Sequence, residues 1–226
     1  MHNSLIMYAF ALQTIINIKY KKMKTNFLKT GRFLLKSALL LSLSLSVINC
    51  SKDDAPAPTP TAVLAPLQDP LPGYLAASGF NEKITPSING TDYEDGYSFI
   101  PLVNGKMTAI VVKIPDARLG LRVTVWDKVA GTVIRTEAID VATAGVEVTK
   151  QITALDLVKD KEYFITMNTN DYYEYSKTDN TAVTYPFIVG DIKITSYGNK
   201  YGTAQVMPLN QELRFYAGVC SFKFQK

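Results

Sequence analysis

Leu121-Arg122-Val123-Thr124-Val125-Trp126 decides the fold class, because apolar and polar residues alternate up to Val125. Successive side chains of a β-strand point to opposite faces, so this pattern predicts a strand with Leu121, Val123 and Val125 buried. The alternation recurs at 110–114, 146–152 and 163–168, and other β-branched and aromatic runs lie at 97–102, 132–139, 185–189, 191–197 and 213–224. These runs predict an all-β fold, a single jelly-roll or immunoglobulin-like β-sandwich of about 8–10 antiparallel strands.

Turn residues separate these runs, and three positions allow specific predictions. Asn104-Gly105 and the turn that ends at Gly131 are typical of hairpin connections. In the last run the apolar residues change phase at Gly218, which predicts a β-bulge there. Leu157 precedes Tyr163 by six residues at the start of a strand, which resembles the tyrosine corner of fibronectin-type and immunoglobulin-type sandwiches. We therefore expect Tyr163 to be structural, with its hydroxyl bonded to the upstream backbone.

The region before the sandwich resembles a bacterial lipoprotein leader. Residues 23–49 contain a basic segment followed by an uncharged apolar run, as in a secretory signal peptide. Val47-Ile48-Asn49-Cys50 resembles a lipobox, so Cys50 is the expected site of lipid attachment. Ser51, Lys52, Asp53 and Asp54 resemble the surface-export signal of Bacteroidota lipoproteins, and the alternative is a solvated charge cluster. We expect an anchor in outer-membrane lipid and exposure at the cell surface.

The remaining boundaries follow from composition. Residues 1–22 hold a second apolar stretch and are predicted to be a start-site extension upstream of Met23, or alternatively a short membrane helix. Residues 50–75 form a lipidated, Pro-rich tether, because six of the 11 prolines lie between Pro56 and Pro72. Residues 76–226, about 150 residues, are enough for one domain.

The net charge argues against nucleic acid as a partner. Seven of the 24 Lys and Arg and none of the 20 Asp and Glu lie in residues 1–50, so residues 51–226 have 17 basic and 20 acidic side chains. Their net charge of −3 lacks the basic footprint of a nucleic-acid-binding protein.

The positions of the histidine and the cysteines limit the catalytic and redox chemistry that the mature chain can perform. The one histidine, His2, lies in the leader, so triads that need His are excluded from the mature chain, while a two-carboxylate glycosidase stays open. With Cys50 lipidated, Cys220 has no disulfide partner and is expected to be a buried, inert thiol.

Several short segments resemble a jelly-roll-like domain of unknown function found in bacterial surface and glycan-associated proteins. They are Thr85–Gly90, Leu121–Asp127, Gly131–Val133 and Leu157–Tyr163. The resemblance implies a sandwich and contact with carbohydrate, and it supplies no catalytic residues.

Three acidic residues within four positions, Asp92, Glu94 and Asp95, are a candidate calcium site. Calcium prefers several oxygen ligands on a tight loop. The spacing does not match an EF-hand, and the alternative is an acidic turn before the strand at Tyr97. A structural calcium is the one cofactor that the sequence suggests.

Asn170, Asp171, Tyr172, Tyr173 and Tyr175 form a candidate ligand-binding loop directly after a strand. Aromatic faces can cover the apolar side of a sugar ring while amides and carboxylates bind its hydroxyls. The alternative is that these tyrosines pack beneath the loop or form another strand. Trp126 is a second candidate, either as an exposed platform or as a residue covered by a neighbouring loop.

These observations favour a lipid-anchored, non-catalytic binding module at the cell surface, with carbohydrate as the ligand. The first alternative is a structural or adhesive protein that binds other envelope proteins. The second is a glycosidase that uses two carboxylates.

Overall fold

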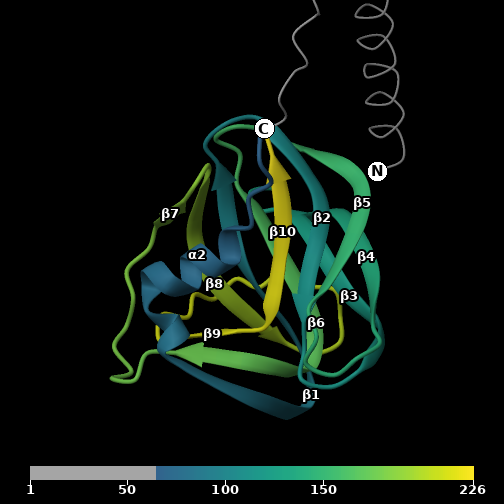
Figure 1. Ribbon diagram of the computed structural model, residues 1–226, viewed down its shortest axis with the longest axis vertical. Coiled ribbons are helices and arrows are strands. Elements are labelled where there is room, and N and C mark those ends of the chain that lie inside the picture. Colours follow the sequence, from purple (N-terminus) through teal and green to yellow (C-terminus); the bar gives the residue numbers. More distant parts are fainter. Residues whose placement is uncertain (1–64) are drawn as a thin grey trace, which may run out of the picture. The chain divides into compact units, whose positions relative to one another are not determined.

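Ten antiparallel strands form within residues 65–226, the part of the chain that the computed structural model describes (Figure 1). One α-helix, α2 (Pro70–Ser78), and a short 3-10 helix, η1 (Phe80–Glu82), precede them. The strands are β1 Lys83–Pro101, β2 Gly105–Lys113, β3 Arg118–Asp127, β4 Thr132–Val141, β5 Val148–Leu157, β6 Tyr163–Ser176, β7 Phe187–Val189, β8 Ile192–Tyr201, β9 Phe215–Ala217 and β10 Val219–Gln225.

The strands pair into two sheets that pack on each other. The large sheet has the order β4-β3-β6-β1-β8-β7, with β9 on β6, and the small sheet has the order β10-β2-β5. Apolar side chains such as Val123, Ile165 and Phe222 fill the space between them. The alternation at Leu121–Val125 is visible in this core, since these three apolar residues of β3 are at most 1% exposed. The predicted all-β sandwich is confirmed.

Helix α2 covers part of the same core. Leu71, Tyr74 and Leu75 are buried, and the Tyr74 ring packs edge-on against Tyr216 with centroids 5.6 Å apart. Pro70 occupies the first helical position, where the missing N–H of proline leaves no hydrogen bond unmade. Pro70 and Pro72 therefore lie in the first turn of a helix, whereas the sequence pattern assigned both to the tether.

The chain joins the sandwich beside the last strand. Gln68 and Phe224 exchange two backbone hydrogen bonds, each 2.8 Å long. Asp69 caps α2 by accepting a hydrogen bond from Leu71 N, and its carboxylate also pairs with Lys223 of β10 at 3.0 Å. The packed residues thus begin upstream of residue 76, where the end of the tether was expected.

The ladder between β1 and β6 bends in the middle. Pairing runs from Lys83–Ser176 to Ile88–Asp171 and resumes at Tyr93–Thr169, so residues 89–92 of β1 lie opposite Asn170 alone. Extra residues in one strand bend it and increase its twist. In Figure 1 the first part of β1 consequently lies across the lower end of the sandwich, whereas β2 and β10 run lengthwise.

Gly218 is the point at which the chain passes from one sheet to the other. β9 pairs with β6 in the large sheet, and β10 pairs with β2 in the small one. Gly218 has φ 84°, and a Cβ there would lie 2.5 Å from Met167 Cε, so glycine suits both the conformation and the space. The β-bulge predicted at Gly218 is therefore wrong: the apolar residues change phase because the chain crosses between sheets, and the register shift of β10 lies at Lys223/Phe224.

Of the two predicted hairpins, one is confirmed and one is wrong. The turn that ends at Gly131 joins the paired strands β3 and β4, and the Asp127 carboxylate accepts hydrogen bonds from Val129 N and Ala130 N in that turn. Asn104-Gly105 instead joins β1 of the large sheet to β2 of the small one.

The predicted tyrosine corner is confirmed. Val158 N donates a hydrogen bond of 3.0 Å to the Tyr163 hydroxyl, five residues downstream. Leu157 and Tyr163 are both buried. Tyr163 is therefore a structural residue.

Two further findings concern the described part of the chain. No helix within residues 65–226 is long and apolar enough to cross a membrane. Cys220 is a buried free thiol, and burial raises its pKa, as expected for an inert cysteine.

Candidate functional site

The stretch Asn170–Tyr175, predicted to be a loop, is the second half of β6. Residues 171–176 pair with β1 on one side, and the last three of them pair with β9 on the other. Neighbouring side chains in a strand point to opposite faces, so Tyr172 and Tyr173 diverge. Tyr175 is 8% exposed and belongs to the core. These tyrosines therefore do not form one aromatic surface, and the alternative of another strand is the one observed.

The polar residues of this stretch support the bend in the ladder. Asn170 Nδ2 donates to Asn89 O at 3.0 Å, and Asn89 Nδ2 donates to the Tyr172 hydroxyl at 2.7 Å. The buried Asp171 carboxylate accepts a hydrogen bond of 2.7 Å from Asp116 N. Burial raises the pKa of Asp171, and this hydrogen bond opposes the rise. Tyr172 and Tyr173 remain half-buried.

Trp126 is covered and cannot act as an open platform in this structure. Its side chain is 3% exposed and packs with Phe164 and Met207. Trp126 Nε1 donates a hydrogen bond of 3.0 Å to Thr166 Oγ1. The expectation that a neighbouring loop covers this residue is the correct one of the two alternatives, because Met207 follows β8 in such a loop.

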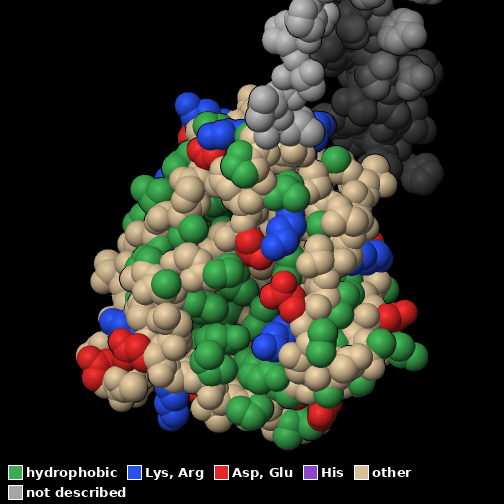
Figure 2. Space-filling view, in the orientation of Figure 1, with side chains coloured by type: hydrophobic (Ala, Val, Ile, Leu, Met, Phe, Trp, Pro, Cys, Tyr) green, Lys and Arg blue, Asp and Glu red, His purple; other side chains and the backbone are tan. Residues whose placement is uncertain are grey.

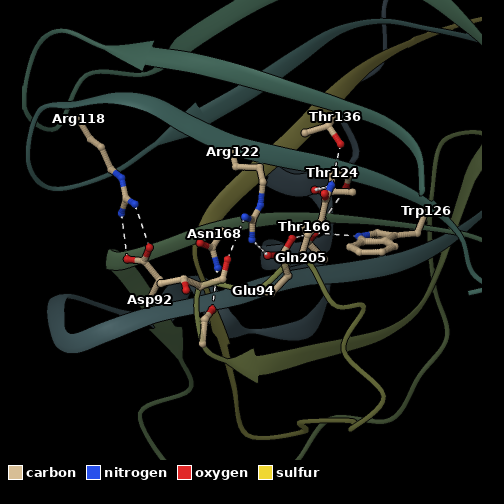
Figure 3. Close-up of polar contacts among 12 residues, drawn as sticks. Asp92, Glu94, Arg118, Arg122, Thr124, Trp126, Thr136, Thr166, Asn168 and Gln205 are labelled. Atoms are coloured by element: carbon tan, nitrogen blue, oxygen red, sulfur yellow. Dashed lines mark hydrogen bonds and ion pairs between the residues drawn. The ribbon is translucent and has the colours of Figure 1, made fainter. Parts of the chain in front are cut away.

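Asp92 and Glu94 lie on the outer face of the large sheet, away from the apolar core, and Figure 3 shows each beside an arginine. Asp92 accepts two hydrogen bonds from Arg118, at 3.0 and 3.2 Å. Glu94, which is fully buried, accepts one from Arg122 Nη2 at 2.7 Å and one from Thr166 Oγ1 at 2.6 Å. Both carboxylates thus have an arginine partner from β3, and such charge-assisted bonds are strong.

Asp95 lies on the opposite face of β1, toward the core. Its Oδ1 accepts a hydrogen bond of 2.9 Å from the Tyr197 hydroxyl, and among residues 65–226 its buried Oδ2 has no partner. Burial raises the pKa of Asp95 to about 7, and the nearby Glu94 carboxylate adds to the rise. Asp95 is therefore a carboxyl group that the fold holds in its neutral form more readily than usual.

The three carboxylates do not meet, so the predicted calcium ligands are not brought together. Two of them point to one face of β1 and are neutralised by arginines, and the third points to the other. Within the described residues there is no group of three or more His, Cys, Asp or Glu side chains that could hold a metal ion. The segment is also not a turn, since it lies inside β1.

Residues 202–212, here called the covering loop, lie over the outer face of the large sheet. Its backbone accepts hydrogen bonds from Asn168 and Arg122, at Gly202 O and Thr203 O. Gln205 Nε2 donates to Thr124 Oγ1 and Thr136 Oγ1, at 3.0 and 2.7 Å (Figure 3). Sequence reasoning missed Arg118, Arg122 and Gln205. The polar residues that alternate with apolar ones in β3 were the available signal for the two arginines.

A surface hollow of about 370 Å3 lies where the covering loop returns to the end of β8. The Asn210 side chain bonds Asn199 twice there, accepting from Asn199 N and donating to Asn199 Oδ1, both at 3.0 Å. Gly198 permits this approach, since a Cβ would lie 2.5 Å from Asn210 O. The lining residues are Asn199, Lys200, Tyr201, Val206, Met207, Leu209 and Asn210. Gly198 and Asn199 are residue types that often form turns, but here they lie inside strand β8.

A second hollow, of about 430 Å3, lies at the end of the sandwich where the chain enters. Its lining includes Asn104, Lys106, Asp156 and Lys226, and an exposed ion pair joins Lys106 to Asp156. On the face drawn in Figure 2, acidic and basic side chains are interspersed. The second hollow is thus lined by charged and polar groups and lacks an aromatic residue, whereas the first contains Tyr201.

No family model matches the chain, and no curated protein matches it either. The resemblance to a bacterial surface domain therefore stays a prediction. So do the start-site extension at 1–22, the signal peptide at 23–49, lipidation at Cys50 and the export signal at 51–54, which lie outside the described residues.

Proposed function

We propose that this chain is a non-catalytic binding module, anchored to outer-membrane lipid through Cys50, exposed at the cell surface, and specific for carbohydrate. The anchor and the location rest on the leader and the export signal alone. The ligand class rests on the surface of the sandwich described above.

The direction of the strands supports display of a ligand site away from an anchor. The chain enters the sandwich at Gln68, beside the end of β10, and Gln68 Nε2 also donates to Asp191, next to the start of β8. β8 then runs to Tyr201, a rise of about 30 Å at 3.3 Å per residue. The hollow beside Tyr201 thus lies at the end remote from the point of entry.

The observation that carries the carbohydrate proposal is a group of partly exposed tyrosines and asparagines at that remote end. Tyr93 and Tyr201 are direct partners across β1 and β8, and their rings meet edge to face at 5.4 Å. Tyr172 is half-buried on β6, the strand on the other side of β1, and its hydroxyl accepts a hydrogen bond of 2.7 Å from Asn89 Nδ2. Tyrosine and asparagine together offer an apolar face and neutral hydrogen-bonding groups, which suits a sugar ring.

The arrangement of the candidate acidic residues favours a binding role over a two-carboxylate glycosidase. Asp92 and Glu94 are each held by an arginine, and Glu94 is fully buried. An acid and a base of a glycosidase must face each other across the scissile bond. Asp92, Glu94 and Asp95 do not have that arrangement.

Affinity electrophoresis of the full-length protein, purified in detergent, tests the ligand class. We expect slower migration in a gel that contains one of xylan, galactomannan, laminarin or pectin, relative to a gel without polysaccharide. Unchanged migration in all four, together with no signal on a glycan array, would contradict the carbohydrate proposal.

Metabolic labelling with palmitate tests the anchor. We expect label on the wild-type protein and none on Cys50→Ala, whereas the control variant Cys220→Ala should keep the label because that thiol is buried. Label that persists on Cys50→Ala would contradict attachment at this residue.

Binding to another envelope protein is the second candidate, and one observation favours it. Residues 83–88 form an outer edge of β1, where Ile84 and Ile88 are 53% and 69% exposed. Pro86 has no N–H, which disfavours pairing with a further strand at that edge, so a protein partner would contact the exposed Ile84 and Ile88 side chains instead. Cross-linking in cells separates the candidates, because a protein partner would be lost on Ile88→Lys whereas carbohydrate binding would not.

A further inference from the structure

The geometry points to the hollow between β8 and the covering loop as the carbohydrate-binding site, with Tyr201 as its aromatic contact. This inference rests on the proposed function and assigns it a place and a set of residues. The expected ligand is a glycan that presents the apolar face of a pyranose ring to Tyr201 and its hydroxyl groups to Asn199 and Asn210.

The first argument is exposure along β8. The side chains of Tyr197, Asn199 and Tyr201 point to the same face of the strand. Burial decreases along this row, from a fully buried Tyr197 to a Tyr201 that is 66% exposed. Leu209, on the part of the covering loop that lines the hollow, is 85% exposed. Large exposed aromatic and aliphatic side chains beside one concavity are typical of a binding surface.

The second argument is that the hollow is preorganised. The two hydrogen bonds between Asn199 and Asn210 hold the covering loop against β8. Glu212 N also donates to Tyr197 O at 3.0 Å, which fixes the loop where it leaves the hollow. The Tyr201 ring packs edge to face with the Tyr93 ring, and this contact restrains the orientation of Tyr201. A ligand therefore does not have to order these groups, which reduces the cost of binding.

The third argument is the chemistry of the lining. A primary amide has two N–H donors and an oxygen with two lone pairs, so the mutual bonds of Asn199 and Asn210 leave further groups free for a ligand. Lys200 supplies one positive charge at the rim. Neutral amides with an aromatic ring favour hydroxylated ligands over purely apolar ones. The volume of about 370 Å3 lies at the lower end of the range for small-molecule sites, about 300–1,000 Å3, which suits a short segment of glycan.

The hollow has a built-in reporter. Met207 lines it and also packs on Trp126, the one tryptophan of the chain. A ligand that contacts Met207 should therefore change the fluorescence of Trp126. This signal does not require a variant, so it tests the location of binding independently of any effect on folding.

The experiment measures binding of full-length protein in detergent to the polysaccharide that retards it most. Tyr201→Ala should weaken binding at least tenfold, while Tyr201→Phe, which keeps the ring, should stay within about threefold of wild type. Leu209→Ala should weaken binding a few-fold. Leu119→Ala is the matched control, since Leu119 is 78% exposed and lies outside the hollow, and it should bind as wild type does.

Three results would overturn the inference. The first is full binding by both the single variant Tyr201→Ala and the double variant that combines Tyr201→Ala with Asn210→Ala. Another is loss of binding in Tyr172→Ala with retention in Tyr201→Ala, which would move the site to the bent half of β6. The third is saturation of wild type with no change in Trp126 fluorescence. In all three cases wild type still binds carbohydrate, so the proposed function survives, whereas absence of wild-type binding would remove both.

Thermal unfolding of each variant accompanies the binding measurement. Because Tyr201 and Leu209 are largely exposed, the variants Tyr201→Ala and Leu209→Ala should melt within a few degrees of wild type. A variant that has lost binding but keeps its melting temperature supports the inference. If Tyr201→Ala melts much earlier, restored binding in Tyr201→Phe and the fluorescence titration of wild type decide the outcome.

Discussion

Two adjacent carboxyl groups, on opposite faces of β1, have different partners. Glu94, on the outer face, is buried with an arginine and a threonine hydroxyl as partners. Asp95, on the inner face, is buried with one tyrosine hydroxyl and an oxygen that has no partner in residues 65–226. Burial alone does not determine the state of an acid, because the partner supplied by the neighbouring strand decides whether charge is tolerated.

The largest expected effect concerns Asp95 and pH. Its pKa is about 7 in the folded protein and near 3.8 when unfolded, so the folded state holds the proton more tightly. The resulting stabilisation is fully present below about pH 4, falls as pH rises toward 7, and is lost above that. At about 1.4 kcal/mol for each pKa unit, the decline in unfolding free energy is about 4 kcal/mol.

Urea unfolding of wild type and Asp95→Asn between pH 4 and 8 measures this decline. The asparagine keeps an oxygen for the Tyr197 hydroxyl but cannot ionise. The difference between the two proteins should therefore change in favour of the variant as pH rises. A difference that is constant over this range would show that Asp95 titrates normally in the folded protein.

The next effect concerns the outer face. Arg122→Met should lower the unfolding free energy by about 3 kcal/mol, because it leaves the buried Glu94 without its cation. The estimate is at the low end for a broken buried pair since the arginine side chain is 26% exposed. Denaturant unfolding at pH 7 checks it. Glu94→Gln in the same chain should restore much of the loss, and no restoration would indicate that Arg122 matters for packing rather than charge.

The smallest effect concerns the covering loop. Gln205→Ala removes two side-chain hydrogen bonds at a partly exposed position and should cost about 1 kcal/mol. Trp126 fluorescence should shift to longer wavelength if the loop lifts and admits water. Thr149→Ala, an exposed change on β5 of the small sheet, is the control and should leave the emission unchanged. An unshifted spectrum for Gln205→Ala would show that the other contacts of the covering loop, such as Met207 on Trp126 and Arg122 on Thr203 O, hold it in place.

Local patterns predicted well what local geometry determines. The alternation in β3 identified its buried face, and Leu157 with Tyr163 identified the corner, because each involves residues within one strand or one turn. Gly218 was found through a phase change in adjacent residues. Its role as a crossing between sheets depends on which strands β9 and β10 pair with, and no local pattern contains that.

The site was harder to predict for the same reason. Tyr172 lies in a strand because residues 83–88, far back in the chain, pair with it. Trp126 is covered because the loop after β8 crosses the outer face, and the spacing of Asp92, Glu94 and Asp95 suggested a shared ligand although a strand sends neighbours apart. The hollow at Tyr201 needs Asn210 to return to Asn199, a contact between loop and strand that composition does not reveal.

The pairing of Gln68 with Phe224 has a mechanical consequence. A pull on the chain upstream of Gln68, opposed by a polymer held near Tyr201, would act along the length of β8 and β1. Their interstrand hydrogen bonds lie across that direction and would be loaded in shear, many together, rather than peeled apart one at a time. If the proposed anchor and ligand site are correct, this sandwich should resist tension better than one that is pulled across its strands.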